Sequence, residues 1–175
     1  SAEIESDGLL LALGTIASSP AGVGLSILFA RLRKGYPVRD YLCLNWPGWR
    51  SAGLWCLVAI GFAAASDLVT VLVLRRPLVP DVMVELYENA RLRPLLWLAV
   101  VVAAPLVEEF IFRGFFFRGL QGTGDSRFRN AAAIVVTSGT WAAIHVQYDA
   151  YGIASVFLSG ILLGWVRLKT KSVWL

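Results

Sequence analysis

The sequence predicts an all-α protein that crosses a lipid bilayer several times. Hydrophobic residues make up 57% of its 175 residues and charged residues 16%, against about 25% charged residues in soluble domains. Several apolar segments approach the roughly 20 residues that a helix needs to cross the hydrocarbon core. No segment alternates polar and apolar residues as barrel strands do, so helices are the remaining backbone structure that lipid tolerates. We therefore expect one transmembrane domain over residues 1–175, a polytopic bundle of about five spanning helices.

Five apolar segments are the predicted spans. They are residues 8–30, 51–74, 95–117, 131–146 and 152–168. The first contains Pro20 and three glycines, which favour a kink or the close approach of a neighbouring helix. The connector 35–50 is rich in Trp and Pro, and we place it at the membrane interface, where Trp is enriched. Residues 172–175 have the composition of another apolar helix at its start, so we expect further helices beyond residue 175.

The basic residues indicate topology rather than nucleic-acid binding. The formal net charge is +4, and membrane proteins concentrate Lys and Arg in their cytoplasmic loops. With the N-terminus outside, the inner stretches carry eleven Lys and Arg residues and the outer stretches carry four. We therefore expect an integral protein of a bacterial plasma membrane with its N-terminus outside. The two cysteines, Cys43 and Cys56, fit no zinc spacing and are expected to be free thiols.

Three ionisable residues lie close together in the third predicted span. Glu108, Glu109 and Arg113 all fall within residues 95–117, where charges are costly and usually functional. Glu109 and Arg113 are four residues apart, so their side chains share one helix face and favour an ion pair. Glu108 points about 100° away from Glu109 and has no partner on its own helix. The spacing therefore predicts a structural role for Glu109 with Arg113 and a role as general base for Glu108.

His145, the one histidine of the chain, lies at the end of the fourth predicted span. Trp141 precedes it by four residues and shares its helix face. We expect His145 to hold or activate a water molecule together with Glu108. Counted from the outer face, Glu108 is about 13 residues deep and His145 about 7, a mismatch of roughly 10 Å. The prediction therefore requires the third helix to begin near Val101.

These residues resemble the signature of the CAAX protease and bacteriocin-processing family. That signature is Glu-Glu-x-x-x-Arg followed by an aromatic residue, three residues of any type and His. This chain has Glu-Glu-Phe-Ile-Phe-Arg at 108–113 and Trp-Ala-Ala-Ile-His at 141–145. Trp141 stands where Phe is commoner, and Pro105 comes just before the acids. The resemblance covers residues 104–171 firmly and the N-terminal half in general character.

The resemblance implies a metal-independent, glutamate-type intramembrane endopeptidase that needs no cofactor. By that match Glu108 activates the attacking water with help from His145, while Glu109 and Arg113 shape the site. The family's third motif, a His and an Asn on a later helix that stabilise the oxyanion, has no counterpart in this sequence. That helix either lies outside these residues or is missing in this member.

The expected partners are membrane lipid and a membrane-associated or exported peptide or protein substrate. Trp141 and Phe112 are the aromatic residues assigned to contact with that substrate. Partner subunits of a membrane complex remain open, and nucleic acid is not expected. Asp67, in the second predicted span, either pairs with Arg113 or lines a water-filled cavity, and the pairing is favoured.

Three alternatives compete with the glutamate protease. The sequence does not contain the His-Glu-x-x-His pattern that zinc proteases usually have. A rhomboid-like serine protease needs a Ser–His dyad, but Ser138 lies on the helix of the histidine itself and Ser159 lacks the usual preceding glycine. The third alternative is a non-catalytic subunit that binds or assembles within a membrane complex, which the absent third motif favours.

Overall fold

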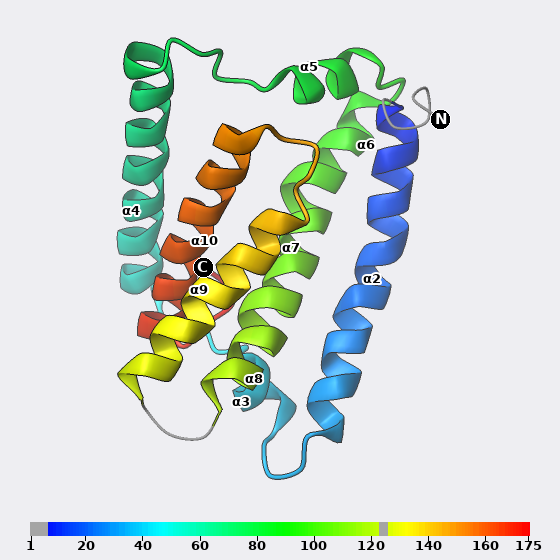
Figure 1. The fold of residues 1–175 in the computed structure, drawn as a ribbon. Coiled ribbons are helices and arrows are strands. Elements are labelled where there is room, and N and C mark those ends of the chain that lie inside the picture. The colour runs from blue at the N-terminus through cyan, green and yellow to red at the C-terminus, as the bar shows by residue number, and fades with distance from the viewer. Residues whose placement is uncertain (1–6, 123–125) are drawn as a thin grey trace.

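The computed structural model describes residues 7–122 and 126–175, and within these ranges the regular structure is helical. The predicted all-α class is therefore confirmed (Figure 1). Among the described residues, four helices are long and apolar enough to cross a membrane. They are α2 (Gly8–Leu32), α4 with its π-helical end (Trp49–Val73), the long helix Arg93–Gln121, and α10 (Ala150–Thr170).

The fourth predicted span is a helix but is too short to count among these four. It is α9 (Arg127–Ala143), whose 17 residues rise about 26 Å, less than the roughly 30 Å hydrocarbon core. Two arginines, Arg127 and Arg129, occupy its first turn, so only its later turns are apolar. Figure 1 shows α9 running obliquely and ending beside α7, part-way along the long helix.

The long helix carries the acidic pair and changes its winding along its length. It runs through α6 (Arg93–Leu98), α7 (Ala104–Glu108) and α8 (Phe117–Gln121), joined by π-helical turns at Ala99–Ala103 and Glu109–Phe116. Pro105 has no backbone N–H to donate, which disturbs the regular hydrogen-bond ladder. Just before it, the Ala104 N–H bonds the Ala99 carbonyl five residues back. π-Turns inside helices are frequent at functional sites, and the second one includes both Glu109 and Arg113.

Small residues let the helices of this bundle approach closely. A Cβ added at Gly160 of α10 would lie 2.8 Å from the Ser138 Cβ of α9. On the other side of the long helix, a Cβ added at Gly22 of α2 would lie 2.4 Å from Val107. The close approach predicted for the first span is therefore confirmed at Gly22, whereas Gly14 has no neighbour within 4 Å.

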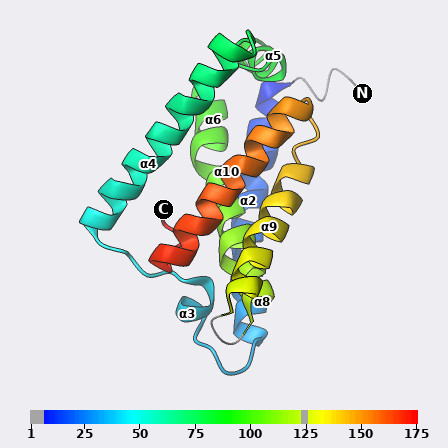
Figure 2. The same cartoon turned by 60° about the vertical axis from the view of Figure 1, so that its left-hand side comes forward.

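Helix α4 lies apart from the other spans (Figure 2), and its contacts with the bundle are mainly with α10. Near its start, the Trp55 and Trp165 rings meet edge-on with centroids 5.2 Å apart. At the far end, the Thr70 and Tyr151 hydroxyls are hydrogen-bonded. Most of its apolar side chains are exposed, as expected for a helix whose solvent is lipid.

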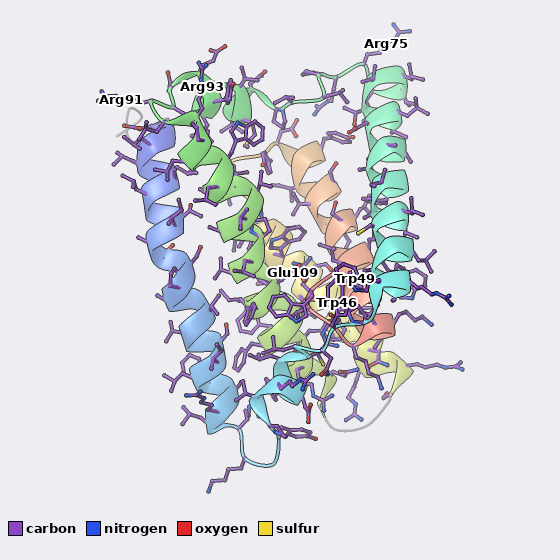
Figure 3. The ribbon with its side chains drawn as sticks, turned by 180° about the vertical axis from the view of Figure 1, so that it is seen from behind. Trp46, Trp49, Arg75, Arg91, Arg93 and Glu109 are labelled. Carbon is purple, nitrogen blue, oxygen red and sulfur yellow. The ribbon has the colours of Figure 1, made fainter. Side chains whose placement is uncertain are left out.

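Two connectors lie at opposite ends of the bundle. The one that contains α3 (Val38–Leu42) is at one end, and the one that contains α5 (Asp81–Glu88) is at the other (Figure 1). Figure 3 shows Arg91 and Arg93 at one side of the α5 end and Arg75 at the other side, at the end of α4.

Two predictions about the remaining segments are corrected by the structure. Residues 172–175 do not start a helix, because Lys171 takes a left-handed φ of 52° and ends α10. Ser172 then pairs with Leu44 in an antiparallel bridge, and the Val173 N–H bonds the Cys43 carbonyl. Asp67 does not pair with Arg113 but lines a pocket at the α5 end of the bundle. Cys43 and Cys56 are free, as predicted.

Candidate active site

Glu108 finds its partner on a neighbouring helix. The Trp141 Nε1–H of α9 donates to Glu108 Oε2 across 3.0 Å. Glu108 is the last residue of α7, directly before the π-helical turn, and its side chain is half-buried. A carboxylate held through one oxygen keeps lone pairs on the other, so it can still accept a proton from water.

His145 is fixed by the same tryptophan. Its Nδ1 lies 2.7 Å from the Trp141 carbonyl oxygen. Because a carbonyl only accepts hydrogen bonds, this contact assigns the proton to Nδ1 and leaves the Nε2 lone pair of the neutral ring free. The imidazole stands edge-on to Trp141, with centroids 5.3 Å apart, and lies parallel to Tyr148, at 5.9 Å and 13°.

The shift that the prediction requires does not occur at the start of the long helix. The long helix begins at Arg93, not near Val101. Instead, α9 ends at Ala143, before the end of the predicted span, and residues 144–149 form a non-helical loop that leads to α10. Figure 1 shows that the end of α9 therefore lies beside α7, where Glu108 is located.

The predicted ion pair between Glu109 and Arg113 is present. Glu109 Oε1 lies 3.3 Å from Arg113 Nη1, and the arginine side chain is only 1% exposed. The guanidinium also lies over the Trp141 ring, 4.2 Å from its centroid. The two acids thus have different partners, as the spacing predicts, and Trp141 contacts both the Glu108 carboxylate and the Arg113 cation.

Arg167 is the site residue that the sequence did not reveal. The sequence places it with the cytoplasmic cations at the end of the fifth predicted span, yet it is 3% exposed. Its Nε–H donates to the Arg113 carbonyl across 3.0 Å, and its guanidinium lies 5.2 Å from the Phe117 ring centroid. One feature of the sequence does indicate burial: Arg167 stands between the apolar residues Val166 and Leu168. In the structure it lies inside α10. Arg167 therefore ties α10 to the π-helical turn that carries the ion pair.

The two aromatic residues assigned to the substrate have different settings. Trp141 is half-buried at the centre of the site. Phe112 is buried and packs edge-on against Phe116, with centroids 6.0 Å apart. Substrate contact through either ring remains a prediction. Ser138 is fully buried against Gly160, which places it in the α9–α10 contact.

Tyr148 connects the site to a pocket at the α5 end. It stacks on His145 and also lines a cavity of about 630 Å³. Partial burial is the main cause that raises the pKa of the Tyr148 phenol above its usual value, so the hydroxyl stays protonated at neutral pH. In the part of the chain that the structure describes, no group of three or more His, Cys, Asp or Glu residues is arranged to hold a metal ion.

Comparison with protein families gives a match that covers this site. Residues 90–175 match the family described as Type II CAAX prenyl endopeptidase Rce1-like. The match includes the whole long helix, α9 and α10, and so extends further toward the N-terminus than the resemblance read from the two motifs. No curated protein and no solved structure matches the chain.

Proposed function

Because residues 90–175 belong to the Rce1-like family of type II CAAX prenyl endopeptidases, we propose that this protein hydrolyses a peptide bond in or near the bilayer. The observation that carries the proposal is the double contact of Trp141. Its indole N–H bonds the Glu108 carboxylate, and its carbonyl bonds His145 Nδ1. One residue thus contacts both a carboxylate that can accept a proton and a histidine, and these are the two groups that the proposed water activation uses.

In the proposed reaction a water molecule is held between the free oxygen of Glu108 and Nε2 of His145. Glu108 takes a proton from the water as the water oxygen attacks the carbonyl carbon of the substrate. The tetrahedral intermediate then collapses, the C–N bond breaks, and the proton passes from Glu108 to the leaving amine. The products are a carboxylic acid and an amine, the acid then gives its proton to the amine or to water, and the carboxylate of Glu108 is regenerated for the next cycle.

Glu109, Arg113 and Arg167 have a supporting role in this proposal. The Glu109–Arg113 ion pair neutralises two charges that an apolar environment would otherwise penalise. Arg167 bonds the backbone carbonyl of Arg113 and joins this turn to α10. The three residues thereby fix the helix turn that follows Glu108, and fixed geometry is a major source of rate enhancement.

We place the N-terminus outside a bacterial plasma membrane, so that the α3 end of the bundle faces the cytoplasm. The distribution of basic residues supports this orientation. The α5 end carries four arginines, three of which are visible in Figure 3. The α3 end still has the larger number of cations after the buried Arg167 is set aside.

The test compares new protein N-termini in the native host that carries wild type, Glu108→Ala or His145→Ala. Hydrolysis predicts that both variants lose the same cleavages while their protein levels remain normal. Glu88→Ala, which removes an exposed acid on α5, is the matched control and should keep every cleavage. If all profiles are identical at equal abundance, hydrolysis is rejected and a non-catalytic subunit of a membrane complex is the better description.

A further inference from the structure

A cavity lies at the α5 end of the bundle, between α4, the connector before α5, and the start of α10. Its volume is about 630 Å³, within the range of roughly 300–1,000 Å³ that ligand pockets occupy. We call it the α5-end pocket. Its lining includes the charged or phenolic side chains of Asp67, Arg76, Asp81, Tyr148, Asp149 and Tyr151.

The walls of this pocket are held together by contacts between segments far apart in sequence. Arg76 in the connector forms an ion pair with Asp149 in the loop before α10. The Arg76 guanidinium also lies over the Tyr151 ring, 5.3 Å from its centroid. The hydrogen bond between Tyr151 and Thr70 joins the same wall to α4. The pocket is thus a built feature of the fold, formed where three segments meet.

The pocket leads to the candidate active site through Tyr148. Tyr148 lines the pocket, and its ring is stacked on the His145 imidazole with centroids 5.9 Å apart. A polypeptide that lies in the pocket would therefore contact a residue that itself contacts His145. This adjacency relates the pocket to the substrate of the proposed reaction.

The charges of the pocket do not balance. Arg76 is already paired with Asp149. Asp67 and Asp81 also line the pocket, and within residues 7–122 and 126–175 neither carboxylate has an ion pair or a side-chain hydrogen bond. Asp67 lies on a spanning helix, where an uncompensated carboxylate is costly and rarely kept without a role.

We propose that the α5-end pocket binds the substrate polypeptide beside the bond to be cleaved, with Asp67 and Asp81 receiving a lysine or arginine side chain of that polypeptide. The inference rests on the proposed function and names its substrate class, a cationic polypeptide segment next to the membrane. Charge complementarity of this kind gives specificity, since an acidic segment would bring like charges together.

Binding is tested separately from cleavage, with the full chain carrying Glu108→Ala in phosphatidylcholine nanodiscs. The probes are two fluorescent alanine-based peptides that differ only in having lysine or glutamate at the same positions. We expect the lysine peptide to bind roughly tenfold more tightly, and we expect Asp67→Asn to remove most of that difference. Asp81→Asn should have the same direction of effect.

Glu85→Gln is the matched control, because it removes an exposed acid of α5 that does not line the pocket. It should leave the preference for the lysine peptide unchanged. Equal binding of the two peptides would overturn the proposal, and so would a lysine preference that both Asp67→Asn and Asp81→Asn leave intact. Reversal of the preference by Asp67→Lys would be the strongest support.

The cleavage experiment distinguishes this inference from the proposed function itself. If Glu108→Ala abolishes cleavages but the binding experiment shows no lysine preference, hydrolysis stands and the pocket assignment is rejected. If the lysine preference is present but Glu108→Ala and His145→Ala change no cleavage, hydrolysis is rejected and the pocket remains a site for a cationic polypeptide. If both hold, the lost cleavages should lie within a few residues of Lys or Arg, and Asp67→Asn should reduce them selectively.

Discussion

The Trp141 indole N–H lies 3.0 Å from a Glu108 carboxylate oxygen and joins α9 to the long helix at the level of the acidic pair. The same tryptophan accepts a hydrogen bond from His145 at its carbonyl and lies under the Arg113 guanidinium. Trp141 therefore contacts Glu108, His145 and Arg113, three of the four residues that the two motifs predict for the site. This explains why the aromatic residue of the second motif belongs four positions before the histidine.

Removal of the indole N–H should disturb Glu108 without removing the aromatic ring. Trp141→Phe keeps a ring over Arg113 but leaves Glu108 Oε2 without its donor. A hydrogen bond to a charged group contributes about 1.5–3 kcal/mol, so we expect cleavage to fall by roughly tenfold or more while the protein still folds. The measurement is the rate of cleavage of a native substrate in detergent, normalised to folded protein.

Trp141→Ala is the companion variant and should be worse in two ways. It also removes the ring from the Arg113 guanidinium and from the interior, so stability should fall by about 3 kcal/mol. An unchanged cleavage rate in Trp141→Phe would show that the indole bond does not position Glu108.

Substitution of Glu109 should mainly lower stability, whereas substitution of Glu108 should mainly lower activity. Glu109→Gln leaves the Arg113 cation buried without its counter-charge, and breaking a buried pair in this way costs about 3–5 kcal/mol. We expect a large drop in the thermal unfolding midpoint. Glu108→Gln removes no ion pair, so it should abolish cleavage with a much smaller change in that midpoint.

A double variant checks this division of labour. Glu109→Leu combined with Arg113→Met replaces both charges with apolar groups of similar size, which is often neutral or stabilising for a buried pair. The unfolding midpoint should then return toward that of wild type. If the double variant is as unstable as Glu109→Gln, the ion pair has a role beyond charge neutralisation.

Arg167 should prove necessary for the stability of the site turn. Arg167→Met leaves the Arg113 carbonyl without the Nε–H donor, and an unsatisfied buried acceptor costs about 1–3 kcal/mol. Lys169→Met removes an exposed cation from the same helix and should have little effect. Thermal unfolding of the two variants in the same detergent makes the comparison, and equal losses would contradict a specific role for Arg167.

The sequence predicts correctly those features that depend on the spacing of residues close together in the chain. The Glu109–Arg113 pair follows from a spacing of four residues, and the spans follow from runs of apolar residues. The partner of Glu108 could not be read in this way, because it depends on how α9 crosses the long helix. The position of α9 is set in part by the contact of Gly160 with Ser138, a long-range packing relation that no local pattern encodes.

The same limit explains the two site errors. Arg167 has the sequence appearance of a loop cation, since Lys169 and Lys171 follow it, and only the backbone carbonyl of Arg113 gives it a reason to be buried. The depth of His145 was misjudged because an apolar run does not show where its helix ends. Helix α9 stops at Ala143 although apolar residues continue to Val146.

The stability that Asp149 gives to the wall of the α5-end pocket should depend on pH. The Gly152 N–H and then the Arg76 side chain hold the pKa of Asp149 below its usual value. The folded protein therefore releases this proton more readily than the unfolded chain, so the contribution of Asp149 to stability is complete at neutral pH. It is lost as the pH falls below about 4, through the folded pKa.

Asp149→Asn tests this assignment through the difference between its unfolding midpoint and that of wild type. The difference should be constant from neutral pH to about pH 5 and should shrink below about pH 4. Asp40→Asn is a suitable control, because Asp40 lies on α3 at the other end of the bundle. A difference that is the same at every pH would contradict a charged Asp149 in the folded wall.

The contact between α9 and α10 should control where His145 lies. In Gly160→Ala the new Cβ would meet Ser138 Cβ at 2.8 Å and its Cα at 3.1 Å, so α9 must move away. Overpacking of this kind costs about 1–3 kcal/mol, and a displacement of about 1 Å at a catalytic group can cost about a hundredfold in rate. Ser138→Gly in the same chain clears the space and should recover both stability and cleavage. Gly53→Ala, at a position of α4 with no neighbour within 4 Å, should be tolerated; a Gly160→Ala enzyme as active as the Gly53→Ala enzyme would show that this crossing does not position the histidine.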